Sequence, residues 1–178
     1  AVSARFIYSA VSLEGQAFWL IRTSPVDMKR FLWSKFFYGF VPVTFMMVLL
    51  IFLTNLAMDM SGLLMLLSIG TILILCISVS GLGAGFGAIY PKFKYENIAS
   101  VSMSLGGMVF MLLAFSLVTF TLTIEAWIFY LYNFKAGLGI FQKIQIVVGV
   151  MMILLINVLA FYLPMKMGRK KLEAGLLE

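Results

Sequence analysis

Four long uncharged runs divide this sequence of 178 residues. They contain 23, 32, 28 and 22 residues and cover residues 36–58, 60–91, 97–124 and 144–165. A membrane-spanning helix needs about 20 consecutive apolar residues, so each run is long enough for one crossing of a bilayer. The pattern therefore predicts four transmembrane helices, near residues 37–57, 62–89, 98–123 and 144–164.

The second run is longer than one perpendicular crossing requires. Its 32 residues would form a helix of about 48 Å at 1.5 Å per residue, against roughly 30 Å of hydrocarbon. It is too short to cross twice. We expect one helix that tilts or projects beyond the bilayer at its glycine-rich end.

Composition supports the same fold class, an all-α polytopic membrane protein. Hydrophobic residues make up 63% of the chain and charged residues 11%, with a mean hydropathy of +1.09. Soluble domains average about half apolar and a quarter charged, so a water-soluble globule is excluded. Histidine is absent and Cys76 is the single cysteine, which excludes histidine relays, an internal disulfide and most metal sites. We expect Cys76 to be inert packing.

Lysine and arginine set the expected orientation, because short cytoplasmic loops are enriched in both. If the N-terminus is cytoplasmic, 11 of the 13 basic residues are cytoplasmic: Arg5, Arg22, Lys29, Arg30, Lys35, Lys92, Lys94, Lys166, Arg169, Lys170 and Lys171. Only Lys135 and Lys143 fall outside. Both termini are therefore expected in the cytoplasm. The net charge of +6 indicates topology rather than nucleic-acid binding.

The uncharged runs divide the chain into three parts. Residues 1–35 form a cytoplasmic interfacial segment, 36–165 the transmembrane domain and 166–178 a basic cytoplasmic tail. In the first part, Ser24 and Pro25 resemble the start of a capped helix. The amphipathic helix that follows has two interpretations, a membrane-surface helix or a docking helix for a cytoplasmic partner.

Two other segments outside the spans are candidates for functional elements. A cytoplasmic turn between the second and third spans contains Tyr90, Pro91, Phe93, Glu96 and Asn97. On the other side, residues 125–143 are rich in aromatic side chains. This second segment fits either an aromatic belt among the headgroups or a re-entrant element broken near Gly137.

The glycines of the second span match a nucleotide-binding motif, but the surrounding sequence does not support nucleotide binding. The segment from Gly83 to Ala88 matches G-x-G-x-x-A, yet it follows no strand and no acidic residue lies about 20 positions later. The same glycines give two GxxxG spacings, which favour close helix packing or a hinge. The helix-packing candidates are Gly81, Gly83, Gly85, Gly87, Gly106 and Gly107.

The sequence lacks the motifs expected for ATP hydrolysis and for ion-coupled transport. There is no G-x-x-x-x-G-K-[ST] phosphate-binding loop, so we expect no ATP hydrolysis in this chain. Asp59 and Glu125 lie at the ends of spans, and no ionisable residue lies in the middle of one. This argues against an ion-coupled transporter. The sequence therefore predicts no catalytic, cofactor-binding or metal-binding residues.

Several strings resemble one known family. They are Arg5-Phe6-Ile7-Tyr8, Ser12-Leu13-Glu14-Gly15-Gln16-Ala17-Phe18-Trp19-Leu20, Thr23-Ser24-Pro25-Val26 and Tyr90-Pro91-x-Phe93-x-x-Glu96-Asn97, followed by Gly106-Gly107. Together they resemble the membrane subunits, or permeases, of bacterial ATP-binding cassette (ABC) exporters, over about residues 5–165. Those permeases have six-helix units, so we expect this chain to be the C-terminal part of a longer permease.

The resemblance implies a function and a set of partners. The chain would be the permease of an exporter in the bacterial cytoplasmic membrane, powered by a separate ATPase subunit that holds ATP and magnesium. Membrane subunits would associate as homo- or hetero-oligomers. Residues 125–143 would be the re-entrant element, and residues 14–22 with 24–35 would be the coupling region. The ATPase contacts would be Glu14, Gly15, Phe18, Trp19, Arg22, Ser24 and Pro25.

Two other classes of function remain open. The chain could be a membrane anchor or assembly protein that transports nothing, or an enzyme that acts on lipid. The enzyme interpretation is the weakest, because the sequence lacks histidine, paired intramembrane carboxylates and a nucleophile–base pair.

Overall fold

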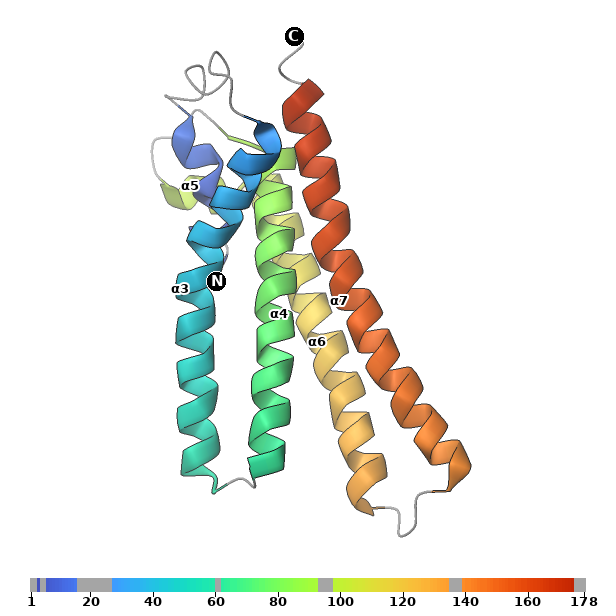
Figure 1. Ribbon diagram of the computed structural model, residues 1–178. Helices are drawn as coiled ribbons and strands as arrows, with labels where there is room; N and C mark the ends of the chain where they lie inside the picture. Colours follow the sequence, from blue (N-terminus) through green and yellow to red (C-terminus); the bar gives the residue numbers. More distant parts are fainter. Residues whose placement is uncertain are drawn as a thin grey trace.

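The computed structural model describes residue 3 and residues 6–15, 27–59, 62–92, 98–134 and 139–174. The described residues form helices and connections and no strand. Two short 3-10 helices come first, η1 (Tyr8–Ala10) and η2 (Ser12–Glu14). Five α-helices follow, namely α3 (Met28–Ala57), α4 (Gly62–Ile89), α5 (Ile98–Ser102), α6 (Leu105–Phe134) and α7 (Ile140–Ala174) (Figure 1).

Four of these helices are long and apolar enough to cross a membrane. They are α3, α4, α6 and α7, and the all-helical class and the number of spans predicted from the sequence are confirmed. The candidate spans are Met28–Ala57, Met65–Ile89, Leu105–Leu131 and Ile140–Ala174. The chain is therefore a multi-pass membrane protein.

Two helices extend beyond the predicted spans, since α6 continues to Phe134 and α7 covers Ile140–Ala174. Two further differences concern helix continuity. The predicted amphipathic helix and the first span form one continuous helix, α3, whose N-terminus is capped by the Asp27 carboxylate accepting from the Lys29 amide. The predicted third span is interrupted between α5 and α6. There the Ser104 hydroxyl accepts from the Gly107 amide at 3.3 Å and caps α6.

The aromatic segment predicted at residues 125–143 belongs to two long helices where it is described. Residues 125–134 complete α6, and residues 140–143 begin α7. Residues 135–138 lie outside the described residues.

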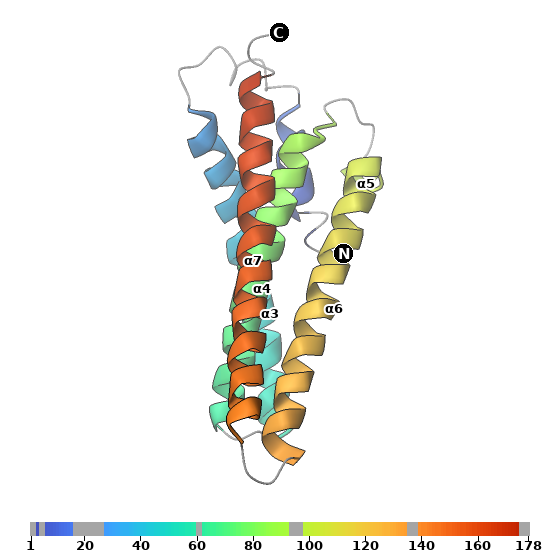
Figure 2. The same cartoon turned by 90° about the vertical axis from the view of Figure 1, so that its right-hand side faces the viewer.

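The four long helices form two antiparallel hairpins, α3 with α4 and α6 with α7 (Figure 1). Helix α4 lies at the centre, where it packs extensively against α7 and α3 and less extensively against α6. Figure 2 shows α7 in front of α3 and α4, with α6 to one side. A tight connection joins α3 to α4, and in it Asp59 has a positive φ of 51°, a left-handed conformation that Asp tolerates better than most residues.

The buried core lies at one end of the bundle. This end, here called the basic end, comprises residues 6–15, 27–39, 84–92, 98–106 and 165–174. All members of the larger buried cluster except Val43 come from it: Ile7, Val11, Met28, Phe31, Leu32, Phe36, Ala84, Ala88, Met165 and Leu172. A second cluster of Tyr8, Leu82, Val101 and Phe110 adjoins it. The segment 6–15 contributes to both.

Candidate functional site

The N-terminal segment, residues 6–15, is inserted between the long helices at the basic end. Its consecutive residues Ile7, Tyr8, Ser9, Ala10, Val11 and Ser12 are all buried. Ile7 contacts α3 and α4, while the Tyr8 ring stacks on Phe110 of α6 with 5.8 Å between centroids. One short segment thus touches three membrane helices.

Glycines make room for this segment. A Cβ on Gly39 of α3 would overlap the Ile7 side chain, and one on Gly83 of α4 would lie 3.0 Å from the Ile7 Cγ2 atom. A Cβ on Gly87 would overlap the carbonyl oxygen of Tyr8. Because that oxygen is backbone, it cannot turn away as a side chain could. Only glycine allows so close an approach at Gly87.

Hydroxyl groups fix the orientation of the segment. The Tyr8 hydroxyl lies 3.0 Å from the Ser104 hydroxyl and donates to the Tyr90 carbonyl oxygen at 3.4 Å. The Ser12 hydroxyl accepts from the Lys92 amide at 3.0 Å. Burial raises the pKa of the Tyr8 phenol, so the phenol keeps the proton it donates. These bonds join the segment to the end of α4 and to the start of α6.

An ion pair fastens the end of the segment to α3. The Lys35 ammonium group binds the Glu14 carboxylate, and both side chains are partly shielded from solvent. The ammonium group also lies 5.5 Å from the centroid of the Phe31 ring. Solvent still reaches both side chains, and a pair of this kind contributes little stability. Its effect is to fix the position of Glu14 beside α3.

The predicted coupling residues are only partly described. Glu14 and Gly15 end the inserted segment, and Gly15 donates its amide to the Ser12 carbonyl oxygen. The others, Phe18, Trp19, Arg22, Ser24 and Pro25, lie outside the described residues. Within the predicted turn, Tyr90 and Pro91 directly follow α4, and Tyr90 receives the Tyr8 bond. Phe93, Glu96 and Asn97 lie outside the described residues.

The two GxxxG registers of α4 face different neighbours. Gly81 and Gly85 face α7, where a Cβ would overlap Phe161 and the backbone of Pro164. Gly168 of α7 faces back toward Gly85. Gly83 and Gly87 face the N-terminal segment, as described above, and Gly83 also lies close to the Phe110 ring of α6.

The remaining predicted glycines lie at the start of α6. A Cβ on Gly106 would lie 2.5 Å from both the Tyr8 hydroxyl and Tyr90, and one on Gly107 would overlap the Ser102 carbonyl oxygen. They therefore lie against the α5–α6 connection and the N-terminal segment.

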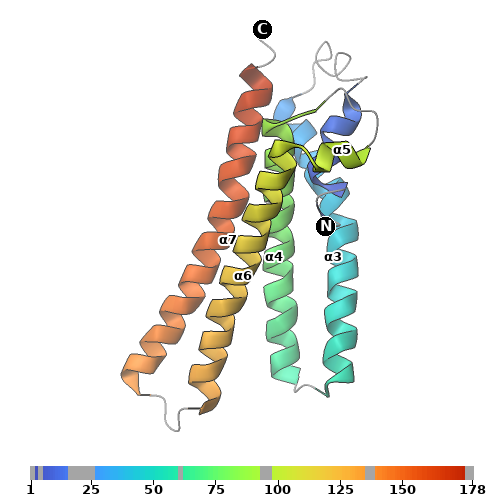
Figure 3. The same cartoon turned by 180° about the vertical axis from the view of Figure 1, so that it is seen from behind.

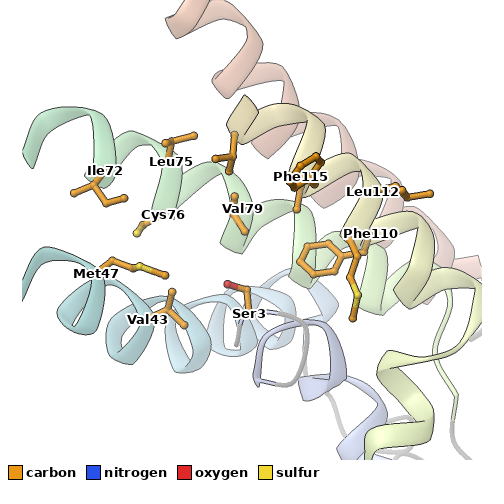
Figure 4. Close-up of a pocket in the computed structure, with 13 residues that line it drawn as sticks. Ser3, Val43, Met47, Ile72, Leu75, Cys76, Val79, Phe110, Leu112 and Phe115 are labelled. Atoms are coloured by element: carbon orange, nitrogen blue, oxygen red, sulfur yellow. The ribbon is translucent and has the colours of Figure 1, made fainter. Parts of the chain in front are cut away.

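A cavity of about 720 Å³ lies next to the N-terminal segment, between α3, α4 and α6 (Figure 4). Cys76 lines it, and Ser3 supplies its one hydroxyl. The remaining lining is apolar: Val43, Met47, Ile72, Leu75, Val79, Phe110, Met111, Leu112, Ala114, Phe115 and Val118. The described lining offers mainly hydrocarbon contacts, with one thiol and one hydroxyl. The described residues also contain no cluster of three or more metal-ligating side chains.

Sequence reasoning gave Tyr8, Ser12 and Ser104 no structural role. Their positions depend on the insertion of residues 6–15, which hydropathy does not reveal. One signal was available in the run of small residues Ser9, Ala10 and Ser12, because small side chains permit close packing inside a membrane bundle.

The chain was compared with known proteins by family, by sequence and by structure. A model of the family described as "Putative ATP-binding cassette" matches residues 1–175. No curated protein and no solved structure matches the chain. The family match covers the four long helices and the inserted N-terminal segment together.

Proposed function

The chain belongs to this ATP-binding cassette family, and from that premise we propose that it is the membrane-spanning permease subunit of an ABC exporter. A separate ATPase subunit binds the basic end and supplies the free energy of ATP hydrolysis. This chain supplies the membrane path and the surface that receives the motion. The basic end then faces the cytoplasm of a bacterial cell, in agreement with the positive-inside rule.

The observation that carries the proposal is the insertion of the N-terminal segment. Residues 7–12 are buried against α3, α4 and α6, and Glu14 is paired with Lys35. The predicted ATPase contacts begin at the end of this segment, with Glu14 and Gly15, and continue along the sequence to Pro25. A displacement of those contacts must therefore be transmitted to three membrane helices through one short segment.

The packing of α4 supports a switch between two arrangements. Helix α4 approaches α7 through Gly81 and Gly85, and it approaches the N-terminal segment through Gly83 and Gly87. Small residues let neighbouring helices approach closely, so a shift of α4 changes its contacts with α7 and with the N-terminal segment at the same time. Transport requires such an element with two packings. We therefore assign the switch to α4 and its two glycine faces.

The first experiment asks whether an ATPase binds this chain. The tagged protein is purified in mild detergent from its native membranes, and its partners are identified by mass spectrometry. We expect a stoichiometric ATPase with a phosphate-binding loop. Substituting Glu14→Gln together with Arg22→Gln lowers its recovery at least tenfold. The matched control, Asp59→Asn with Lys143→Gln, also removes one acid and one base but at the opposite end, and it retains the ATPase.

Two results would overturn the proposal. One is the absence of any ATPase, even after crosslinking in native membranes. The other is equal loss of the ATPase from both pairs of variants while both remain monodisperse, since the contact would then not involve the coupling segment.

A non-transporting membrane anchor would also bind an ATPase, so a second measurement is needed. Ser12 and Lys92 are adjacent, and joining them as Ser12→Cys with Lys92→Cys by oxidation fixes the segment to the end of α4. If the chain is a permease, this crosslink removes most of the ATPase activity of the complex, and reduction of the crosslink restores that activity. If the chain is only an anchor, the complex has the same ATPase activity in the oxidised and the reduced form.

A further inference from the structure

The first turns of α3 and the last turns of α7 lie side by side at the basic end (Figures 1 and 3). Aromatic rings join them: the centroid of Phe161 lies 6.0 Å from that of Trp33 and 5.5 Å from that of Phe36. Beside this contact, Phe37 is 50% exposed and Tyr162 54% exposed. We call this surface the α3–α7 strip, made of residues 29, 30, 33 and 37 of α3 and 162, 166 and 169 of α7.

Cationic side chains border the aromatic part of the strip on both helices. Lys29 and Arg30 lie about one turn before Trp33, and Lys166 lies one turn after Tyr162. All three are exposed, and the Lys166 ammonium group lies 5.6 Å from the centroid of the Tyr162 ring. Each of the two helices thus presents a cationic side chain and an aromatic ring on one face.

Acidic residues do not balance these charges. Among described residues the basic end carries eight lysines and arginines and three acids, while the opposite end carries Lys143 with Asp59 and Glu125. Two of the three acids are engaged, Glu14 by Lys35 and Glu173 by Arg169. The third, Asp27, caps α3 and also interacts electrostatically with Arg169. In the described part of the chain, neither Lys29 nor Arg30 has an ion-pair partner.

We propose that the α3–α7 strip is a binding site for an anionic phospholipid. Its phosphate lies between Lys29 and Arg30 on one side and Lys166 on the other. Its acyl chains follow Phe37 and Tyr162 toward the middle of the spans. This site is independent of the proposed transport function and requires no ATPase.

The order of residues along the helices favours a lipid over an acidic protein. From the end inward, each helix presents cations, then aromatic rings, then a long aliphatic stretch. A phospholipid presents phosphate, then glycerol, then hydrocarbon in the same order. Aromatic rings are enriched at headgroup depth, and basic side chains near the surface attract anionic lipid. An acidic protein would form ion pairs with the cations but would leave the aromatic rings without an apolar partner.

The test measures lipid bound to the purified chain in detergent, without other subunits. Native mass spectrometry counts retained phosphatidylglycerol and phosphatidylcholine with identical acyl chains. The disrupting variant is Lys29→Gln with Lys166→Gln. The matched control, Lys92→Gln with Lys171→Gln, removes the same two charges from the same end but beside Tyr90, whose ring lies 5.0 Å from the Lys171 ammonium group.

We expect the unaltered chain to retain phosphatidylglycerol in preference to phosphatidylcholine. Each lysine near an anionic surface strengthens attraction about fivefold, so the disrupting variant should bind phosphatidylglycerol at least tenfold more weakly. The control should change by less than threefold. Retention of phosphatidylcholine should be the same in all three proteins, which shows that they remain folded.

Four outcomes would overturn the site. In the first, the unaltered chain retains both lipids equally. In the second, both variants lose phosphatidylglycerol equally, so that general surface charge explains the binding. In the third, millimolar glycerol phosphate displaces the lipid, so that the site selects a soluble anion. Loss of ATPase recovery from the disrupting variant with unchanged phosphatidylglycerol binding would assign the strip to an acidic protein instead.

Discussion

The two ends of the bundle are built in different ways. At the basic end, α3, α4, α6 and the inserted segment 6–15 pack closely, and Ile7 and Tyr8 are fully buried. Toward the opposite end the two hairpins diverge (Figures 1 and 3). There Leu66 is 74% and Ile140 81% exposed. The closely packed end is the more highly charged of the two, so hydrophobicity does not explain the difference.

Small residues explain why the basic end packs more closely than the opposite end. Lipid tails are as apolar as leucine, so burying leucine between membrane helices gains little, and close backbone contact decides association. At the basic end, Gly85, Gly87 and Gly168 permit such contact. In the other half of α4, Gly62 and Gly70 have no neighbouring atom within 4 Å. The comparison teaches that stability in this fold depends on where glycines face a neighbour.

The most damaging substitution should be Gly85→Leu. Its side chain would overlap the backbone of Pro164, and overpacking against backbone should destabilise the protein by about 3 kcal/mol. The unfolding free energy in mixed micelles measures this change. Gly70→Leu is the matched control on the same helix and should cost less than about 1 kcal/mol, since nothing lies within 4 Å. Equal losses from the two variants would remove the distinction between the ends.

A smaller effect is expected from Gly87→Ala. The added methyl group meets the Tyr8 carbonyl oxygen, so the segment 6–15 must shift, at a cost of about 1.5 kcal/mol. Hydrogen exchange of the amides of residues 7–12 should become faster. Gly62→Ala, at an open position of the same helix, should leave that exchange unchanged. Unaltered protection in Gly87→Ala would mean that this glycine does not hold the segment in place.

The smallest effect concerns a polar contact between α6 and α7. The Asn157 amide donates to the Thr121 hydroxyl at 3.3 Å, and both residues are buried. Such bonds contribute about 0.6 kcal/mol in membrane proteins, because the unfolded helices also find partners. A double-mutant cycle with Asn157→Val and Thr121→Val measures the coupling. A coupling above about 2 kcal/mol would show that hydrogen bonds, not glycines, dominate the packing of this hairpin.

Hydropathy alone predicted the number and type of the membrane helices, because each span must be a long apolar run. It did not predict that Ile7, Tyr8 and Val11 are buried. In a membrane bundle, apolar residues face lipid and protein alike, so burial leaves little mark on the sequence. The break at Ser104 was missed for a related reason, since a single cap does not interrupt a run of apolar residues.

The candidate site was less predictable than the fold. Glycine spacing identified two faces of α4, but no spacing rule says that Gly81 meets a helix while Gly83 meets the N-terminal segment. The pairing of Glu14 with Lys35 joins residues 21 positions apart. It depends on the tertiary packing of residues 6–15 beside α3, which local sequence patterns do not encode.

The shared direction of α4 and α7 has an electrostatic consequence. Gly81 meets Phe161, and Gly85 meets Pro164 and Gly168, so the two helices run parallel and both end at the basic end. Each helix carries about half a negative charge at its C-terminus, and two such poles side by side repel one another. Lys92 follows α4, and Lys171 lies in the last turn of α7. These cations offset part of the repulsion, so charges that orient a membrane protein also favour the parallel arrangement of α4 and α7 by a small amount.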